Sequence, residues 1–420
     1  MTTDLSRRSF SALTAAGATS AALAGAAGTA AHAVGPSANL ASTPGADALQ
    51  SSMDAMNGNP LHGSMVSVRG SYGFVDLASG QQSRAFRNAI RVNFRARISS
   101  ITKPMVATVV MQEVERGTWT LDSTLDQFLP GLWPGRGKVT IGQLLNHTSG
   151  MPCHLNDFMT AANPTGQVIK AVTDNRYTHA DHVAQAQRYE WKFEPGEGWA
   201  YSNTGYVVLS MLLEKVTGTE IGALLRQRIF DKGLNQTRLY NSRRVDFEEI
   251  EDYHLEGDQE VRLNDLDMSI FSGSGGATAT AADLTDFHHL LMKGHLVSQD
   301  TVDQMLTPVG AAVEAGYGYG VFWIDDVWSG SGKLFGHDGG GFGSTALSLT
   351  SRDGRRRVSL TFAGRAFDED GFTATQEGMA KVLANAFAIS NGTAAGRVRV
   401  LSSAGATSRA FHADARTRIG

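Results

Sequence analysis

Residues 100–117 read SITKPMVATVVMQEVERG and join a polar start to a long apolar run. The run at 105–111 is almost wholly apolar, which places it inside the protein rather than on a surface. The pattern predicts a helix that begins at about Ser100 and stops at Gly117, since glycine readily closes helices. A spacing of three residues puts Ser100 and Lys103 on one face at the start of this helix.

The serine and the lysine together indicate a nucleophile and its base. A serine hydroxyl attacks poorly until a base takes its proton, and burial lowers a lysine pKa by disfavouring the ammonium. Free N–H groups at a helix start also suit a developing oxyanion. Ser99 is the rival nucleophile, but Thr102 stands three residues after it. Alone, the S-x-x-K spacing is weak evidence, because it occurs by chance about once in such a chain and an ordinary helix cap explains it.

A second polar motif, Tyr201-Ser202-Asn203, lies in the stretch PGEGWAYSNTGY of residues 195–206. A phenol aimed at the serine can relay its proton to the leaving group. An asparagine amide can bond both the lysine and a substrate amide. The alternative is a polar loop that caps the next helix through Ser202 or Asn203.

A third motif is the glycine-rich stretch FGHDGGGFG, residues 335–343, which precedes an apolar strand. It contains His337, Gly339 and Gly340. Glycines here allow a substrate backbone to lie against a strand edge. A flexible turn is the alternative.

In this order, the three motifs resemble the class C beta-lactamase and D-alanyl-D-alanine carboxypeptidase family, which has S-x-x-K, then Y-x-N, then K-T-G or H-x-G. The resemblance covers about residues 60–390, with further similar stretches at 94–103, 144–150, 275–284 and 317–320. It implies an acyl-enzyme on Ser100, with Lys103 and Tyr201 sharing the proton transfers. It also implies an oxyanion hole from the backbone N–H groups of Ser100 and Gly340. The substrate-binding residues that it implies are Asn203, which orders the lysine and tyrosine, His337 on the opposite wall, Gly339 and Gly340.

The order of expected elements is strands, a helical middle, then strands and a last helix. They are a hairpin at 64–68 and 72–77, helices at 140–146, 205–216 and 281–292, strands at 344–349 and 358–363, and a helix at 375–387. This order predicts an α+β fold of the beta-lactamase and penicillin-binding transpeptidase type. In it an antiparallel sheet is flanked by helices, and a helical subdomain of roughly 120–270 is inserted in a catalytic domain of 59–390.

The N-terminus reads as an export signal. Ser6-Arg7-Arg8-Ser9-Phe10 is a twin-arginine pattern, an apolar stretch follows over 12–31, and Ala31-His32-Ala33 suits a signal peptidase. A membrane anchor is the alternative, but the stretch is too weakly hydrophobic for a comfortable spanning helix. We therefore expect a signal peptide over 1–33, a secreted or periplasmic protein, and no stable membrane insertion. Residues 34–58 read as a linker or a weak first helix, and 391–420 as a disordered or processed tail.

Composition narrows the classes of partner. Thirty-seven basic and 41 acidic side chains give a formal charge of -4, so nucleic acid is not an expected partner. The single cysteine, Cys153, excludes an internal disulfide and is left as a nucleophile, a dimer bridge or, most simply, a small core or loop residue. Metal-site patterns such as C-x-x-C or H-E-x-x-H do not occur, so no metal or other cofactor is expected. His179 and His182 share a helix face and are expected to be exposed. The oligomeric state stays open.

The expected partner is a small peptide, ester or beta-lactam substrate. A D-alanyl-D-alanine carboxypeptidase or related D-peptidase is the first interpretation, because His337 stands where the family's true beta-lactamases usually carry lysine. An esterase, an amidase or a class C-like beta-lactamase is the second, and the intact motifs disfavour a non-catalytic penicillin-binding sensor. A carboxypeptidase needs a cation for the substrate carboxylate, yet residues 317–326 contain no basic residue, and Lys333 is the nearest candidate. Phe322 and Trp323 would instead suit a hydrophobic ester or amide.

Overall fold

The computed structural model describes residues 44–58, 61–71, 73–85, 88–156, 175–240, 248–256, 259–263, 266–366 and 369–393. The predicted signal peptide and residues 394–420 of the predicted tail lie outside this range. None of the described helices has both the length and the apolar character needed to cross a bilayer.

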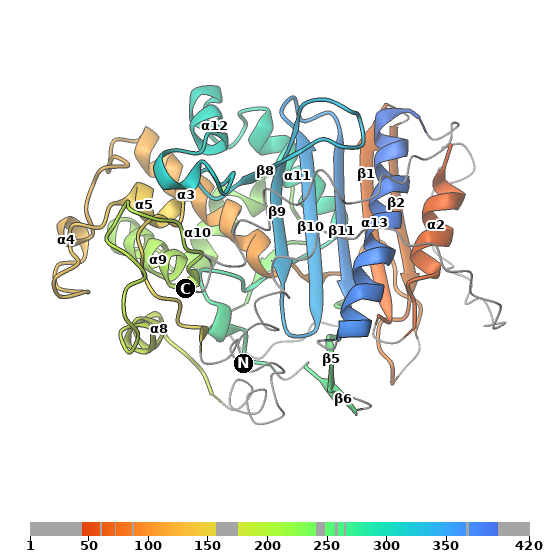
Figure 1. The fold of residues 1–420 in the computed structure, drawn as a ribbon, viewed down its shortest axis with the longest axis horizontal. Coiled ribbons are helices and arrows are strands. Elements are labelled where there is room, and N and C mark those ends of the chain that lie inside the picture. The colour runs from red at the N-terminus through yellow and green to blue at the C-terminus, as the bar shows by residue number, and fades with distance from the viewer. Residues whose placement is uncertain are drawn as a thin grey trace.

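A six-stranded antiparallel sheet forms one half of the molecule, in the order β2-β1-β11-β10-β9-β8 (Figure 1). Its strands come from both ends of the chain: β1 Gly63–Gly70, β2 Gly73–Gly80, β8 Phe322–Asp325, β9 Lys333–Gly340, β10 Ser344–Ser351 and β11 Arg357–Ala363. The N-terminal hairpin joins the C-terminal strands where β1 pairs with β11, with Val66 opposite Leu360. This arrangement confirms the predicted α+β fold with an antiparallel sheet.

Helices cover both faces of the sheet because alternate residues of each strand are buried on opposite sides. Val66 packs into the same apolar cluster as α2 (Ala46–Asp54) and α13 (Glu369–Asn391), which lie on one face. The neighbouring Ser67 points the other way, and its hydroxyl lies 3.1 Å from that of Thr285 in α11 (Ala281–Met292). Residues 34–58 thus contain α2, a helix with a buried apolar side.

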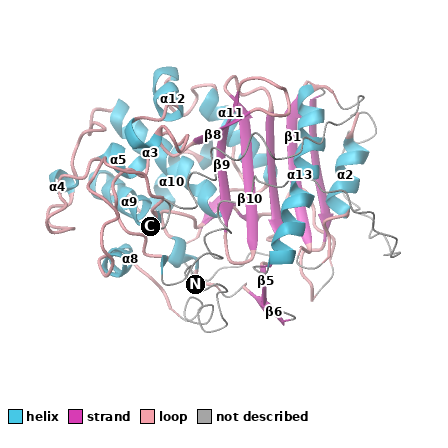
Figure 2. Ribbon diagram, viewed as in Figure 1, coloured by secondary structure: helices cyan, strands magenta, loops and turns pink. Residues whose placement is uncertain are grey.

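A helical region lies beside the sheet (Figure 2). Its apolar side chains form a core of their own. Its central helix is α3 (Thr102–Glu115), which is buried along most of its length. Around it lie α4 Leu125–Phe128, α5 Ile141–Leu145, α8 His179–Ala186, α9 Asn203–Thr217, α10 Ile221–Arg228 and α12 Gln299–Leu306. Two small sheets contain the remaining described strands: β3 Ala96–Arg97, β7 Ala277–Ala279 and β4 Arg238–Leu239 in one, and β12 Arg365–Ala366, β5 Tyr253–Glu256 and β6 Gln259–Arg262 in the other.

The helix expected from Ser100 begins differently from the prediction. Ser99–Ile101 form a 3-10 turn, and the α-helix starts only at Thr102. Ser99 has a positive φ of 47°, which a side chain adopts only under constraint and which prevents a regular helix start at this point. The other end agrees with the prediction, since Gly117 has a φ of 73° just after the helix.

Candidate active site

Ser100 lies in the 3-10 turn between β3 and α3, where the sheet and the helical region meet. The turn packs against β9, and Ser100 is 6% exposed. Its hydroxyl lies 3.0 Å from the Nζ atom of Lys103, one turn further along the chain. The predicted pair is therefore in hydrogen-bond contact.

Lys103 is completely buried and has three hydrogen-bond acceptors. Its ammonium donates to Ser100 Oγ at 3.0 Å, to Asn203 Oδ1 at 2.7 Å and to the carbonyl oxygen of Ser274 at 2.8 Å. Burial lowers the pKa of Lys103 to about 7, while Cys153 and Asp338 act in the opposite direction. Near neutral pH a substantial fraction of Lys103 is therefore the free amine that can accept the serine proton.

Tyr201 and Asn203 reach Lys103 from the start of α9. The Tyr201 ring centre lies 4.8 Å from Lys103 Nζ. Asn203 is the first residue of α9, and the residue between them, Ser202, caps that helix by accepting a hydrogen bond from Gly205 N. The capping interpretation thus applies to Ser202, whereas its two neighbours face the lysine.

His147 holds this segment in place. Its Nδ1 accepts a hydrogen bond from Ser202 N at 3.2 Å, and its ring centre lies 4.3 Å from that of Tyr201. His147 has a φ of 64°, so the backbone turns sharply here. It belongs to residues 144–150, one of the stretches that resemble the family.

Gly339 lets β9 approach the Ser100 turn. A Cβ atom on Gly339 would lie 2.1 Å from the carbonyl oxygen of Ile98 and 3.3 Å from Ser100 N. No side chain fits at that distance, so only glycine permits this contact. Gly340 follows and lines the pocket that contains Ser100.

His337 is buried on the same strand, 1% exposed. Its Nε2 lies 2.9 Å from the hydroxyl of Tyr317, and its ring centre lies 6.3 Å from that of Tyr201. Phe322 also packs against the imidazole, with ring centres 5.6 Å apart. His337 is therefore near Tyr201 but is not among the residues that line the pocket at Ser100.

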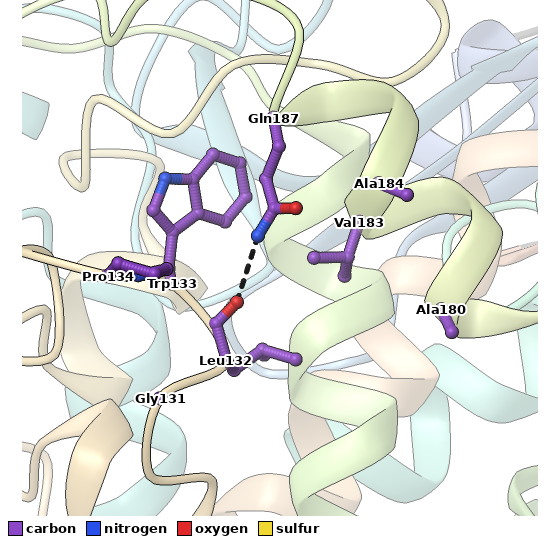
Figure 3. A pocket seen from close by; sticks show the side chains of 8 residues that line it. All are labelled: Gly131, Leu132, Trp133, Pro134, Ala180, Val183, Ala184 and Gln187. Atoms are coloured by element: carbon purple, nitrogen blue, oxygen red, sulfur yellow. Dashed lines mark hydrogen bonds between the residues drawn. The ribbon is translucent and has the colours of Figure 1, made fainter.

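That pocket has an apolar side. The residues that line it are Ser99, Ser100, Leu155, Asn203, Phe271, Gly275, Gly340, Gly341 and Phe342. A larger hollow of about 680 Å³ lies elsewhere, between Gly131–Pro134 and α8, where Gln187 donates to the carbonyl oxygen of Leu132 (Figure 3). It contains none of the predicted site residues, so the site is the smaller pocket at Ser100.

The family model for Beta-lactamase matches residues 61–359, which is more than half of the chain. The chain belongs to the Beta-lactamase family. The match includes Ser100, Lys103, Tyr201, Asn203 and His337, so the whole constellation described above lies within it.

Two relatives and one solved structure are similar in sequence to this Beta-lactamase family member. Penicillin-binding protein 4* of Bacillus subtilis (strain 168) is 27% identical over 69% of this chain, but the chain spans only 63% of that relative's length. Esterase EstB of Burkholderia gladioli is 28% identical over 35% of this chain and 38% of its own. The crystal structure of a D-stereospecific amidohydrolase from Streptomyces sp. has a TM-score of 0.66 and 28% identity, over 79% of this chain and 98% of that one.

Sequence reasoning missed several residues at the site. Cys153 lies beside it, with Sγ 3.4 Å from Asn203 Nδ2. Ser274 supplies a backbone oxygen to Lys103, and Phe271 and Phe342 line the pocket. A backbone acceptor and an apolar pocket wall have no sequence motif by which they could be recognised. Cys153 has no neighbouring sequence pattern that would distinguish an active-site thiol from a small core residue.

Three expectations need correction. His182 is buried, because its ring stacks on Tyr177 and His154 and bonds the carbonyl oxygen of Ser269 at 2.8 Å. Lys333 begins β9, seven residues before Gly340, so about 23 Å separate it from the oxyanion region at ~3.3 Å per residue. Its ammonium instead lies over the ring of Trp323. Phe322 and Trp323 do not line the pocket at Ser100, whose apolar side chains are Leu155, Phe271 and Phe342.

Proposed function

We propose that this chain is an exported serine hydrolase that cleaves amide or ester bonds of D-configured peptides or amino-acid derivatives through an acyl-enzyme on Ser100. The observation that carries the proposal is the contact between Ser100 Oγ and a fully buried Lys103 whose pKa is about 7. Supporting it are the D-stereospecific amidohydrolase and the esterase among the relatives.

Each step of this reaction has a described residue to carry it. Ser100 Oγ forms a bond to the substrate carbonyl carbon as its proton passes to the Lys103 amine. The bond to the leaving nitrogen or oxygen then breaks, and the proton reaches that atom from the Lys103–Tyr201 pair. A water molecule attacks the acyl-enzyme in the reverse sense, gives its proton to the same pair, and releases the acid and free Ser100.

The backbone at the junction of β9 and the Ser100 turn suits the charge that develops on the carbonyl oxygen. Gly339 allows the strand to lie against the turn, and the N–H groups of Ser100 and Gly340 are the proposed donors. Loss of one such donor typically costs about 3 kcal/mol of the barrier. This proposed oxyanion hole consists of backbone N–H groups, so it would stabilise the transition states of amides and esters alike.

A D-peptidase or amidase with broad substrate specificity fits the site better than an enzyme specific for D-alanyl-D-alanine termini. A carboxypeptidase substrate ends in a carboxylate, which calls for a cation. The rings that pack around Tyr201 and His337, beside the pair that protonates the leaving group, include the uncharged Tyr317 and Phe322. Lys333 stands at the far end of β9. A substrate whose leaving group is neutral avoids the problem.

The test uses purified mature protein and four substrates: a D-amino-acid nitroanilide, acyl-D-Ala-D-Ala, nitrocefin and a short-chain nitrophenyl ester. We expect turnover of the nitroanilide and the ester, and none of any substrate by Ser100→Ala. Ser99→Ala is the matched control and should keep the activity. Equal activity in Ser100→Ala, or a strict preference for acyl-D-Ala-D-Ala, would contradict the proposal.

A further inference from the structure

Two aromatic rings from distant parts of the chain meet beside Ser100. Phe271 ends a 3-10 helix, Met268–Phe271, and Phe342 lies in the turn between β9 and β10. Their ring centres are 5.7 Å apart, and Leu155 completes the apolar side of the pocket. We propose that Phe271 and Phe342 select substrates whose acyl part carries an apolar, uncharged side chain, an inference that rests on the proposed function.

The position of the pocket assigns it to the acyl part of the substrate. The ring centres of Tyr201 and His337 lie 6.3 Å apart, and neither residue lines the pocket, so the two rings mark a separate side of the site. Since the leaving group takes its proton from the Lys103–Tyr201 pair, it departs on that side. Asn203 lines the pocket, so the part of the substrate that stays bound to Ser100 lies against the two rings.

The backbone around Phe342 is held at several points. Gly341 N donates to Ser344 O at 2.9 Å, and Gly364 N donates to Gly343 O at 2.8 Å. The buried Arg365 donates to Gly341 O at 2.7 Å. Phe342 itself is 3% exposed, so its ring is a fixed wall of the pocket.

Phe271 is the less enclosed of the two rings. Phe271 is half-buried. Its backbone is held, because its carbonyl oxygen accepts hydrogen bonds from Ser274 N and Gly275 N. The cavity between the rings and Ser100 is about 10 Å³, which is room for about one water molecule. An acyl side chain therefore enters only when the Phe271 ring turns outward, and the two rings then enclose it. A charged side chain would lose its water in this space, and none of the residues that line it carries an opposite charge.

The experiment compares D-Phe and D-Glu nitroanilides, which share a leaving group and differ in acyl side chain. We expect kcat/KM of the wild type to favour D-Phe by about 100-fold. Phe271→Lys should lower that ratio at least 10-fold, because it places a cation beside the acyl carboxylate. Phe271→Leu should keep the ratio within about 3-fold, since the wall stays apolar. The control Phe74→Lys, at a residue 53% exposed on β2, should leave it unchanged.

A ratio measured within one preparation does not depend on the fraction of folded enzyme. A wild-type ratio near one, or an unchanged ratio in Phe271→Lys, overturns the inference. Nitrophenyl acetate, which has no acyl side chain, tests the proposed function separately. If the acetate ester is hydrolysed while the ratio does not respond, only the inference is wrong. If neither the ester nor any amide reacts, the proposed function fails and the inference falls with it.

Discussion

Lys103 Nζ lies 3.0 Å from Ser100 Oγ at a place where the lysine side chain has no contact with solvent. The same nitrogen also donates to Asn203 and Ser274, so all three of its donors have an acceptor. Burial disfavours the ammonium and lowers the pKa of Lys103 to about 7, while Cys153 and Asp338 act in the opposite direction. Lys103 is thus set to exchange a proton with Ser100 near neutral pH.

The first prediction is that kcat/KM for a neutral nitrophenyl ester rises with pH and levels off above a midpoint near 7. The free amine is the reactive form, and a base whose pKa is lowered to about 7 gains that form as the pH passes this value. Lys103→Arg should lower the rate by about 10³-fold, because a guanidinium does not lose its proton in this range. A profile that is flat from pH 5 to 9, or that falls through 7, would count against Lys103 as the base.

The second prediction separates two adjacent residues. Tyr201→Phe should lower kcat by about 10²-fold and leave the fold intact, because it removes only the phenol that relays the proton. Ser202→Ala should keep the activity but lower the free energy of unfolding by about 1 kcal/mol, because Ser202 caps α9. Steady-state kinetics and thermal unfolding of both variants check this. The reverse pattern would assign the chemistry to Ser202.

The third prediction concerns Cys153. Its sulfur lies 3.4 Å from the Asn203 amide, whose oxygen binds Lys103. An N-ethylmaleimide adduct on this thiol should displace Asn203 and reduce activity at least about 100-fold, the range expected when an active-site group is moved by about 1 Å. Cys153 is the one cysteine of the chain, so intact-mass measurement shows directly when labelling is complete.

Cys153→Ser is the control for the labelling experiment. It should stay active and become insensitive to the reagent, since a hydroxyl can still accept a hydrogen bond from Asn203. Complete labelling of the wild type with full activity would show that the thiol has no influence on the site.

How far the sequence predicts this site depends on what each residue contributes. Ser100, Lys103, Tyr201 and Asn203 act through side chains at fixed spacing, and the structure brings all four together. The sheet was predictable as well, since alternation and the glycine turns mark β1, β2, β10 and β11.

Other features depend on tertiary contacts that no local pattern encodes. The 3-10 turn at Ser99 is a backbone conformation imposed where β9 and β7 meet the turn. Phe271 and Phe342 are 71 residues apart in sequence and meet only in the folded chain. Local apolar content placed the pocket wall at Phe322 and Trp323, because it could not show which face of the strand each side chain would occupy.

The fourth prediction concerns export. Arg7 and Arg8 precede a weakly apolar stretch, the pattern of a twin-arginine signal. Changing both to lysine should leave the precursor in the cytoplasm, because the receptor reads the arginine pair and not the charge alone. Fractionation of cells that express each form, followed by mass measurement of the exported chain, checks this. Unchanged export of the double-lysine variant would refute the twin-arginine route.

The last prediction is that beta-lactams acylate Ser100 and are released slowly. Acylation by the proposed mechanism needs Ser100, the contact of its hydroxyl with Lys103, and the proposed backbone donors beside Gly339. At the third motif, however, this chain has His337, a buried imidazole in contact with Tyr317 and Phe322, in place of the lysine usual in the family's true beta-lactamases. Nitrocefin turnover should therefore be at least 10-fold below that of a nitrophenyl ester, while intact mass shows one adduct on the peptide that contains Ser100. An adduct on Ser99 or Cys153 would refute the site, and nitrocefin turnover above every ester and amide would make beta-lactams the preferred substrates.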